Sequence, residues 1–485
     1  MDEVEVGGTV VRIPDAMVRG AGRHRGIRGH RGRRPEAAAV HLLRDGALTE
    51  ADELLQEVVA TPAATAESWF VSAETASALG ATDRAVAGYE AALAHRPDAP
   101  GLWWARLGSA ALAADRPERA AEAYERAVRS RESSPVGWQR DLARAYAAGG
   151  RPADAAAVWA KVVDGQERPS KQAVAELVRY LVRAGRRKEA TRRLHAMLDR
   201  DPATRPLDRV MAANNPELFG MRRNVLHFVE DHLTQIRDAA EESLRADTGT
   251  HTGTHTDRRS TIWTYWAQGW DAAPAVVAMC HRRLHALAGP DVAALDHDGA
   301  ARLVRVPPDI DAMDLGHAAR SDLLRLELLG RYGGTWIDAT CFVTEDPRPH
   351  LARLSAGGFF AFEKARSTLA SWLIVSEADN YLVRMARSAL HAYLREYGEW
   401  RYYFLFHYVF ESLVLCDDEA NRLWARSPRG YGRPTAFKKH RAEQADALDL
   451  DALFAESFVQ KLSHRHSDEA LATPGSLLNH LLASY

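Results

Sequence analysis

The 485-residue chain lacks the features that mark three special classes of protein. Its three cysteines, Cys280, Cys341 and Cys416, are too few for a disulfide scaffold and favour a reducing compartment. No apolar run approaches the roughly 18 residues of a spanning helix, and the acidic start shows no secretory signal. A net charge of −2 excludes the overall basic character of many nucleic-acid binders. We therefore expect a cytoplasmic, multi-domain protein with no transmembrane segment, and leave open a peripheral attachment to the inner face of the membrane.

Residues 1–37 contain little that could contribute to a core. Between Arg19 and Arg34 lie seven arginines, two histidines and five glycines, without an acidic residue. Such a segment cannot bury enough apolar surface to offset the entropy of ordering it, so we expect a disordered basic tail. The alternative is a contact with anionic lipid or nucleic acid. Nucleic acid is the partner that the sequence favours least, because the chain as a whole is not basic.

Residues 38–205 repeat along the sequence. Similar helical segments begin at residues 49, 83, 118, 153 and 188, in steps of 34 or 35 residues. The period resembles that of tetratricopeptide repeats and predicts an all-α solenoid of four to five units. Its groove would take a protein or peptide partner; a spacer or a dimerisation arm is the alternative. Small residues recur where paired helices would cross closely, at Ala85, Ala120, Ala155 and Ala190.

Two segments follow the repeats. The pattern over 217–246 predicts one long amphipathic helix, within a connecting segment over 206–247 that could cap the solenoid. Residues 248–259 are rich in threonine, glycine and histidine, which predicts a flexible linker. His251 and His255 are four residues apart, but a metal site is disfavoured because nothing in this segment would preorganise it.

Residues 260–485 change from helical periodicity to an alternation of strands and helices. The β-branched and aromatic run over 261–269 predicts a strand that runs into a glycine turn. The pattern predicts helices over 273–288 and 316–331 and a further strand over 335–343. Such alternation predicts an α/β domain, with helices packed on the faces of a sheet. Ligands of open α/β sheets bind outside the carboxyl ends of the strands, so polar residues at those ends are the candidates for function.

One segment of this domain places several such residues together. Asp322 and Arg325 are three apart on a predicted helix and therefore share a face. Trp336, Asp338 and Thr340 alternate along the following strand and therefore point to one side. Carboxylates at a strand end beside an arginine suit a divalent cation and a diphosphate. The alternative for Asp322 and Arg325 is an ordinary ion pair on a helix surface.

The sequence from 321 to 340, SDLLRLELLGRYGGTWIDAT, resembles the sugar-binding DXD region of family 32 glycosyltransferases. It is still more similar to the bacterial capsular polysaccharide synthesis proteins, and more remotely to the glucosyltransferase domains of large clostridial toxins. Segments 262–274, 403–410 and 461–465 extend the resemblance over about residues 260–466. The resemblance implies a Rossmann-like GT-A fold and retaining transfer of a hexose from a nucleotide sugar. The acceptor would be a glycan, a lipid-linked molecule or a protein, and Mn²⁺ or Mg²⁺ would bind the diphosphate.

The resemblance also implies roles for individual residues. Trp266 falls where the family stacks the nucleotide base. Asp322 and Arg325 fall where the family holds the donor sugar and the ribose, and Trp336 lies beside them. Asp338 is the first acid of DXD. Asp322, Arg325 and Asp338 are the predicted catalytic residues.

Thr340 replaces the second acid of DXD. A threonine hydroxyl can hydrogen-bond a metal-bound water, but it brings no charge. With Asp338 it forms the predicted metal site, and another group would complete the coordination shell. The candidates are Glu345, Asp346, Glu363 and His464.

Three residues near the ends of the resemblance are further candidates. Lys461 suits a diphosphate as a compact charge in a chain with few lysines, although a surface lysine is the alternative. His464 is a predicted donor-binding residue. His407 lies in an aromatic run, where a core histidine is favoured over a contact with the acceptor or the diphosphate.

Two hypotheses of different classes remain. The first is a metal-dependent glycosyltransferase whose solenoid recruits the acceptor or a partner. The second is an adaptor or scaffold with a degenerate transferase domain that at most binds the nucleotide sugar, and Thr340 is the residue that favours it.

Overall fold

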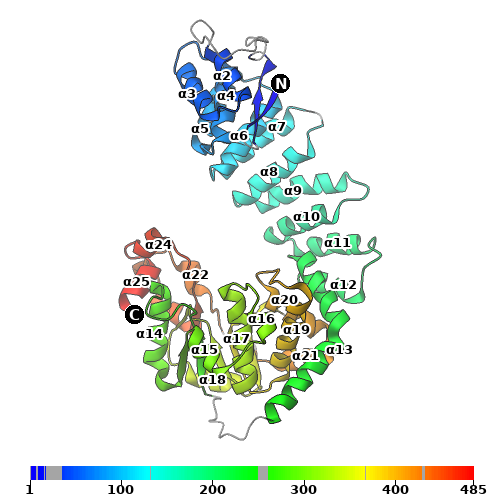
Figure 1. The fold of residues 1–485 in the computed structure, drawn as a ribbon, viewed down its shortest axis with the longest axis vertical. Helices are drawn as coiled ribbons and strands as arrows, with labels where there is room; N and C mark the ends of the chain where they lie inside the picture. The colour runs from blue at the N-terminus through cyan, green and yellow to red at the C-terminus, as the bar shows by residue number, and fades with distance from the viewer. Residues whose placement is uncertain are drawn as a thin grey trace. The chain divides into compact units, whose positions relative to one another are not determined.

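The computed structural model divides into two compact units, Met1–Pro202 and Ala203–Tyr485 (Figure 1). It describes residues 2–6, 9–15, 17, 35–131, 133–249, 260–365, 368–428 and 432–485. The arginine-rich stretch from 19 to 34 and residues 250–259 of the predicted linker lie outside the described residues. No helix among the described residues has both the length and the apolar character that crossing a membrane requires.

The first unit is a helical solenoid, as the repeat predicts. Its helices pack as successive antiparallel pairs: α4 on α5, α6 on α7, α8 on α9 and α10 on α11. The recurring small residues lie in the interior; Ala85, Ala120 and Ala155 are fully buried, and a Cβ on Gly108 would lie 2.7 Å from the ring of Tyr124. The bounds are α2 Pro35–Arg44, α3 Leu48–Val59, α4 Ala66–Ala78, α5 Thr82–His95, α6 Gly101–Ala113, α7 Pro117–Arg129, α8 Val136–Ala148, α9 Pro152–Asp164, α10 Lys171–Arg183 and α11 Arg187–Leu198.

The start of the chain corrects the prediction of an all-α unit preceded by a disordered tail over 1–37. Strands β1 (Asp2–Val6) and β2 (Thr9–Ile13) form an antiparallel hairpin. Val11 and Ile13 are fully buried in a core cluster with residues of α2, α3 and α4. Valine and isoleucine alternate here with polar residues, which is the period-two pattern of a half-buried strand. The neighbouring arginine run drew attention away from that pattern.

The second unit contains a mixed sheet. Within the described residues its five strands lie in the order β4-β3-β5-β8-β7. β3 is parallel to β4 and β5, whereas β8 is antiparallel to β5 and β7. A separate antiparallel pair joins β6 to β9. The bounds are β3 Ile262–Tyr265, β4 Val292–Leu295, β5 Gly334–Ile337, β6 Cys341–Val343, β7 Phe359–Ala365, β8 Thr368–Ser376 and β9 Val459–Lys461.

The long helix before the linker belongs to the second unit and packs there. Helix α13 (Phe219–Gly249) lies against α19 (Tyr381–Tyr397) and α20 (Leu405–Cys416) (Figure 1). Its buried stripe, which includes Val225, Phe228 and Ile236, joins the core formed with these helices. The sequence analysis expected a connecting segment that caps the solenoid. The amphipathic face was identified, but its partners follow it in the chain.

Helix α17 (His317–Tyr332) carries the central segment and leads directly into β5. Gly333 ends the helix with φ +66°, and a Cβ there would lie 2.6 Å from the backbone nitrogen of Ala378. Its carbonyl accepts a hydrogen bond from the indole of buried Trp263 on β3. Only glycine fits this close, left-handed turn. The turn fixes how the residues of α17 face those at the end of β5. Other helices of this unit are α12 Pro206–Asn214, α14 Ala275–Ala288, α18 Arg348–Ser355, α21 Asp418–Arg426, α22 Ala436–His440, α23 Leu450–Ala455, α24 Asp468–Ala472 and α25 Leu477–Ser484.

Candidate functional site

A cavity of about 1030 Å³ lies in the second unit. This volume is at the upper end of the range for small-molecule sites. Most of the residues predicted for the site line it, although they come from distant parts of the chain. They are Trp266, Asp322, Arg325, Asp338, Thr340, His407, Lys461 and His464.

Asp338 is the centre of a polar cluster in this cavity. It follows the carboxyl end of β5, and its backbone N–H donates to the carbonyl of Trp372 on β8 at 2.8 Å. Its Oδ1 accepts hydrogen bonds from Trp336 Nε1 at 2.8 Å and Arg325 Nη2 at 3.2 Å. Its Oδ2 accepts from Lys461 Nζ at 2.8 Å. Two cations therefore hold one carboxylate in a fixed position. We call Asp338, Arg325, Lys461, Trp336, Thr340 and Asp322 the Asp338 cluster.

Arg325 bridges the helix and the sheet. Its guanidinium pairs with Asp322 at 3.1 Å, donates to the carbonyl of Ser371 and lies 4.9 Å from the ring centroid of Trp336. Asp322 is 8 % exposed and Arg325 is 3 % exposed. The alternative of an ion pair on a helix surface is therefore wrong. α17 packs this face against the sheet, which buries both side chains.

Lys461 is placed by the small sheet. β9 pairs with β6 so that Lys461 lies opposite Cys341, beside the end of β5. From there Nζ reaches Asp338 and also hydrogen-bonds the hydroxyl of Thr340. The alternative of a surface lysine is wrong, because this side chain is only 22 % exposed and points into the cluster.

The surroundings of Asp338 and Asp322 shift the pKa values of these two carboxylates in opposite directions. Burial raises the pKa of Asp338, but Lys461 and Arg325 more than offset this effect and hold that pKa at about 2. Burial raises the pKa of Asp322 to about 6; Arg325 opposes the rise and the nearby Asp338 adds to it. Asp338 is therefore ionised throughout the neutral range, whereas Asp322 titrates just below it.

Trp266 and His464 lie side by side at the cavity. Their rings meet edge to face with centroids 5.4 Å apart. Burial, together with Arg465, lowers the pKa of His464, so its imidazole is neutral near pH 7. A partly exposed indole beside a neutral imidazole offers flat apolar faces, which suit a planar ring such as a nucleotide base.

Trp336 takes a place that differs from the expectation, whereas His407 takes the place that the sequence favoured. Trp336 is 1 % exposed and packs in the core, so it positions Asp338 rather than lining the cavity. His407 is 9 % exposed and its ring lies 5.2 Å from that of Phe404. It is buried like a core histidine, and it also lines the cavity.

The side chains present do not fit the predicted divalent cation. Both oxygens of Asp338 are engaged by nitrogen donors, and Thr340 is engaged by Lys461. Of the four candidates to complete the shell, Glu345 and Asp346 pair with His350 and Arg348 and do not line the cavity, whereas Glu363 and His464 do line it. Across the part of the chain that the structure describes, no group of three or more His, Cys, Asp or Glu residues could hold a metal ion.

The sequence analysis missed two cations that line the cavity. They are Lys438, within α22, and Arg465, which follows His464. Lys438 belongs to a Lys-Lys pair in a chain that uses arginine almost everywhere, and this signal could have identified it. Its distance along the chain from the central segment hid its relevance.

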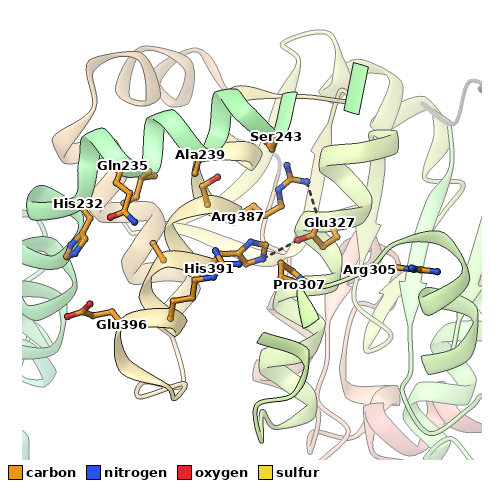
Figure 2. Close-up of a pocket in the computed structure, with 14 residues that line it drawn as sticks. His232, Gln235, Ala239, Ser243, Arg305, Pro307, Glu327, Arg387, His391 and Glu396 are labelled. Carbon is orange, nitrogen blue, oxygen red and sulfur yellow. Dashed lines mark hydrogen bonds and ion pairs between the residues drawn. The ribbon is translucent and has the colours of Figure 1, made fainter. Parts of the chain in front are cut away.

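A second cavity, of about 430 Å³, lies between α13, α17 and α19 (Figure 2). Glu327 Oε2 accepts from Arg387 Nη1 at 3.2 Å, and Glu327 Oε1 lies 3.2 Å from His391 Nε2. Figure 2 shows the carboxylate between these two partners. We call Glu327, Arg387 and His391 the Glu327 cluster. Glu327 follows Arg325 by two residues and therefore lies on the opposite face of α17.

The matches to family models agree with the division of the chain into a helical solenoid and a second unit. A family model described as "Capsular polysaccharide synthesis protein" matches residues 221–481, and a tetratricopeptide repeat model matches 70–135 and 105–170. Among curated proteins, none matches the sequence. Similar solved structures include MamA from Desulfovibrio magneticus RS-1, 20% identical, covering 34% of this chain and 92% of that one with a TM-score of 0.29. Another holds the repeats of a putative kinesin light chain from Podosopora anserina, 26% identical, covering 34% of this chain and 94% of that one with a TM-score of 0.27.

Proposed function

The chain belongs to the family of capsular polysaccharide synthesis proteins, and from this premise we propose that its second unit is a retaining glycosyltransferase. It would move a hexose from a nucleotide sugar to a glycan, a lipid-linked molecule or a protein. The observation that carries this proposal is the Asp338 cluster, a preorganised set of two cations and two carboxylates inside a cavity of about 1030 Å³.

The chemistry of the cluster suits the departure of a diphosphate. When the glycosidic bond of the donor breaks, negative charge grows on the diphosphate oxygen. Arg325 and Lys461 are held in place before the reaction, so they stabilise this charge without reorganising. Asp338 orients both cations. Asp322, on the other side of Arg325, is available to accept a hydrogen bond from a hydroxyl of the donor sugar.

The fold places this chemistry where α/β proteins commonly bind ligands. Asp338 follows the carboxyl end of β5, which is parallel to β3, and Trp266 follows the carboxyl end of β3. A GT-A arrangement, with the diphosphate near Asp338 and the base near Trp266 and His464, is part of the proposal. Because the side chains present do not fit the predicted Mn²⁺ or Mg²⁺, the charge on the diphosphate is assigned to Arg325 and Lys461 alone.

The solenoid indicates a protein or peptide partner. Stacked repeats of this kind expose an extended concave surface. We propose that this surface brings the acceptor, or a protein that carries it, to the transferase.

The test is the substitution Asp338→Asn in the full chain. Removing the charge that holds Arg325 and Lys461 should lower the release of nucleoside diphosphate by about 100-fold or more. The matched control is Asp451→Asn, an exposed aspartate outside the cavity, which should keep full activity. Circular dichroism would verify that both variants fold. Full activity in Asp338→Asn would contradict the assignment.

A second function is favoured by one observation, namely that Thr340 stands in the place of an acid and binds Lys461. An adaptor with a degenerate transferase domain would bind a nucleotide sugar without turning it over. Thermal shift against a panel of nucleotide sugars, followed by an assay for diphosphate release, separates the two. Stabilisation without release, with acceptor extracts supplied, would favour the adaptor.

A further inference from the structure

We infer that the ammonium of Lys461 occupies the place of a divalent cation in the Asp338 cluster, so that the site neutralises a diphosphate with protein cations alone. This inference rests on the proposed glycosyl transfer. It differs from the cofactor that the sequence analysis expected, and it gives Lys461 a catalytic role of its own.

The first argument is the position of Lys461. Its Nζ contacts the two side chains that were expected to hold the metal ion, at 2.8 Å from Asp338 Oδ2 and in a hydrogen bond with the Thr340 hydroxyl. A magnesium ion binds a carboxylate oxygen at roughly 2.0–2.1 Å. An ion bound to that oxygen would therefore lie within a few ångströms of the Lys461 ammonium, and the two positive charges would repel each other.

The second argument is that Asp338 has little remaining capacity to bind a metal ion. Its other oxygen already accepts from Trp336 Nε1 and Arg325 Nη2. Both nitrogens belong to side chains that are at least 96 % buried and cannot turn away at low cost. Asp338 is thus committed to nitrogen donors on both sides.

The third argument is the charge of the whole lining. A diphosphate needs compensation for two or more negative charges, and the protein supplies cations at several points of the cavity. Lys438 and Arg465 lie with Arg325 and Lys461 on its wall. The acids of the lining are Asp322, Asp338 and Glu363, so the lining has one cation in excess.

Lys461 also has the rigidity that a stand-in for a metal ion requires. β9 anchors its backbone through the pairing with Cys341 on β6, and its N–H donates to the carbonyl of Pro434 at 2.6 Å. Its ammonium forms an ion pair with the Asp338 carboxylate, and a neighbouring opposite charge favours the charged form. The site therefore holds a permanent charge in a fixed place.

In the reaction, the bond between C1 of the sugar and the diphosphate oxygen breaks, and its electron pair stays on that oxygen. Lys461 donates a hydrogen bond to an oxygen that gains charge, and Arg325, which Asp322, Asp338 and Ser371 hold in place, contributes its positive charge. The acceptor hydroxyl forms the new bond to C1, and its proton leaves to the diphosphate or to water. In donor hydrolysis, water takes the place of the acceptor.

The experiment compares the full chain with Lys461→Ala and with the control Lys439→Ala, an exposed neighbouring lysine that does not line the cavity. Diphosphate release is measured in EDTA and after addition of Mn²⁺ or Mg²⁺. The unchanged chain and Lys439→Ala should keep their rate in EDTA. Lys461→Ala should lose about 100-fold, as when one charge-stabilising donor is removed, and should recover part of the loss with Mn²⁺. A parent enzyme that loses its activity in EDTA and regains it with Mn²⁺ overturns the inference.

A second measurement separates failure of the inference from failure of the proposed function. Electron paramagnetic resonance detects Mn²⁺ binding without any turnover. We expect no Mn²⁺ site that depends on Asp338 in the parent chain, and a new one in Lys461→Ala that Asp338→Asn abolishes. If no donor reacts, the proposed function fails, and this titration still decides the inference. Mn²⁺ that binds the parent chain and is displaced by Asp338→Asn overturns it.

Discussion

The two polar clusters on α17 have similar composition and different environments. In each, one carboxylate lies between two nitrogen groups: Asp338 between Arg325 and Lys461, and Glu327 between Arg387 and His391. In the Asp338 cluster, the carboxylate and the lysine are each more than 20 % exposed to a large cavity. In the Glu327 cluster, Oε1 of Glu327 and Nε2 of His391 are both shielded from solvent.

The difference teaches that the exposure of the side chains to a large cavity, rather than the types of residue present, distinguishes a candidate site from a structural ion pair. A ligand can reach Lys461 and Asp338, whose side chains are more than 20 % exposed, whereas Glu327, Arg387 and His391 contact one another between α17 and α19 with side chains that are 10–12 % exposed. We therefore expect changes in the first cluster to affect turnover and changes in the second to affect stability. Three predictions test this comparison.

The largest effect is expected for Glu327→Ala. Removing one partner leaves Arg387 buried without its counter-charge, which should cost about 3–5 kcal/mol of unfolding free energy. Urea denaturation measures this loss, and the turnover of the remaining folded enzyme should be close to that of the parent. Replacing Glu327, Arg387 and His391 together by leucine and methionine should restore most of the stability. A stable Glu327→Ala enzyme with impaired turnover would reverse the assignment of the two clusters.

The next effect is expected for Arg325→Lys. A lysine keeps the charge but cannot contact Asp322, Asp338 and the Ser371 carbonyl at once, because it lacks the planar guanidinium. Turnover of the donor should fall by about 100-fold. Arg320→Lys on the same helix, where the arginine pairs with exposed Asp311, is the control and should change little. Equal losses in both variants would show that the effect is a general one on α17.

The smallest effect is expected from pH, through Asp322. With a pKa of about 6, it is protonated at lower pH and then accepts a hydrogen bond from the donor more weakly than the carboxylate does, so turnover should fall as the pH drops below 6. Stability should change in the opposite direction. Because the folded pKa is raised above the unfolded value of about 3.9, the folded state binds more protons, and unfolding free energy falls as pH rises from about 4 to 6. Asp322→Asn should remove the pH dependence of turnover below pH 6 and the pH dependence of the unfolding free energy between about pH 4 and 6. If turnover of this variant still falls below pH 6, another group causes the pH dependence.

Much of the architecture could be predicted from local patterns. The 35-residue step predicted the solenoid, because each repeat carries the same small and large residues at the same places. Period two predicted that Trp336 and Asp338 point to one side, and the indole does donate to that carboxylate. The hairpin Asp2–Ile13 was missed, since two short strands beside an arginine run give a weak signal.

The rest depended on contacts between residues far apart in the chain. Lys461 lies 123 residues from Asp338, and nothing local to either residue encodes their hydrogen bond. The same holds for α13, whose amphipathic face was evident while its partners α19 and α20 lie more than a hundred residues later.

The sequence by itself determined the repeat, the α/β pattern of the second half, and the residue types at the end of β5. These follow from periodicity and short-range spacing, which the backbone enforces wherever a helix or strand forms. Only the tertiary structure decided which cation faces Asp338, that Trp336 supports Asp338 rather than lining the cavity, and that Asp338 and Lys461 are more exposed than the Glu327 cluster on the opposite face of α17. Electrostatic effects depend on distance and burial in space, and the packing of distant strands and helices sets both.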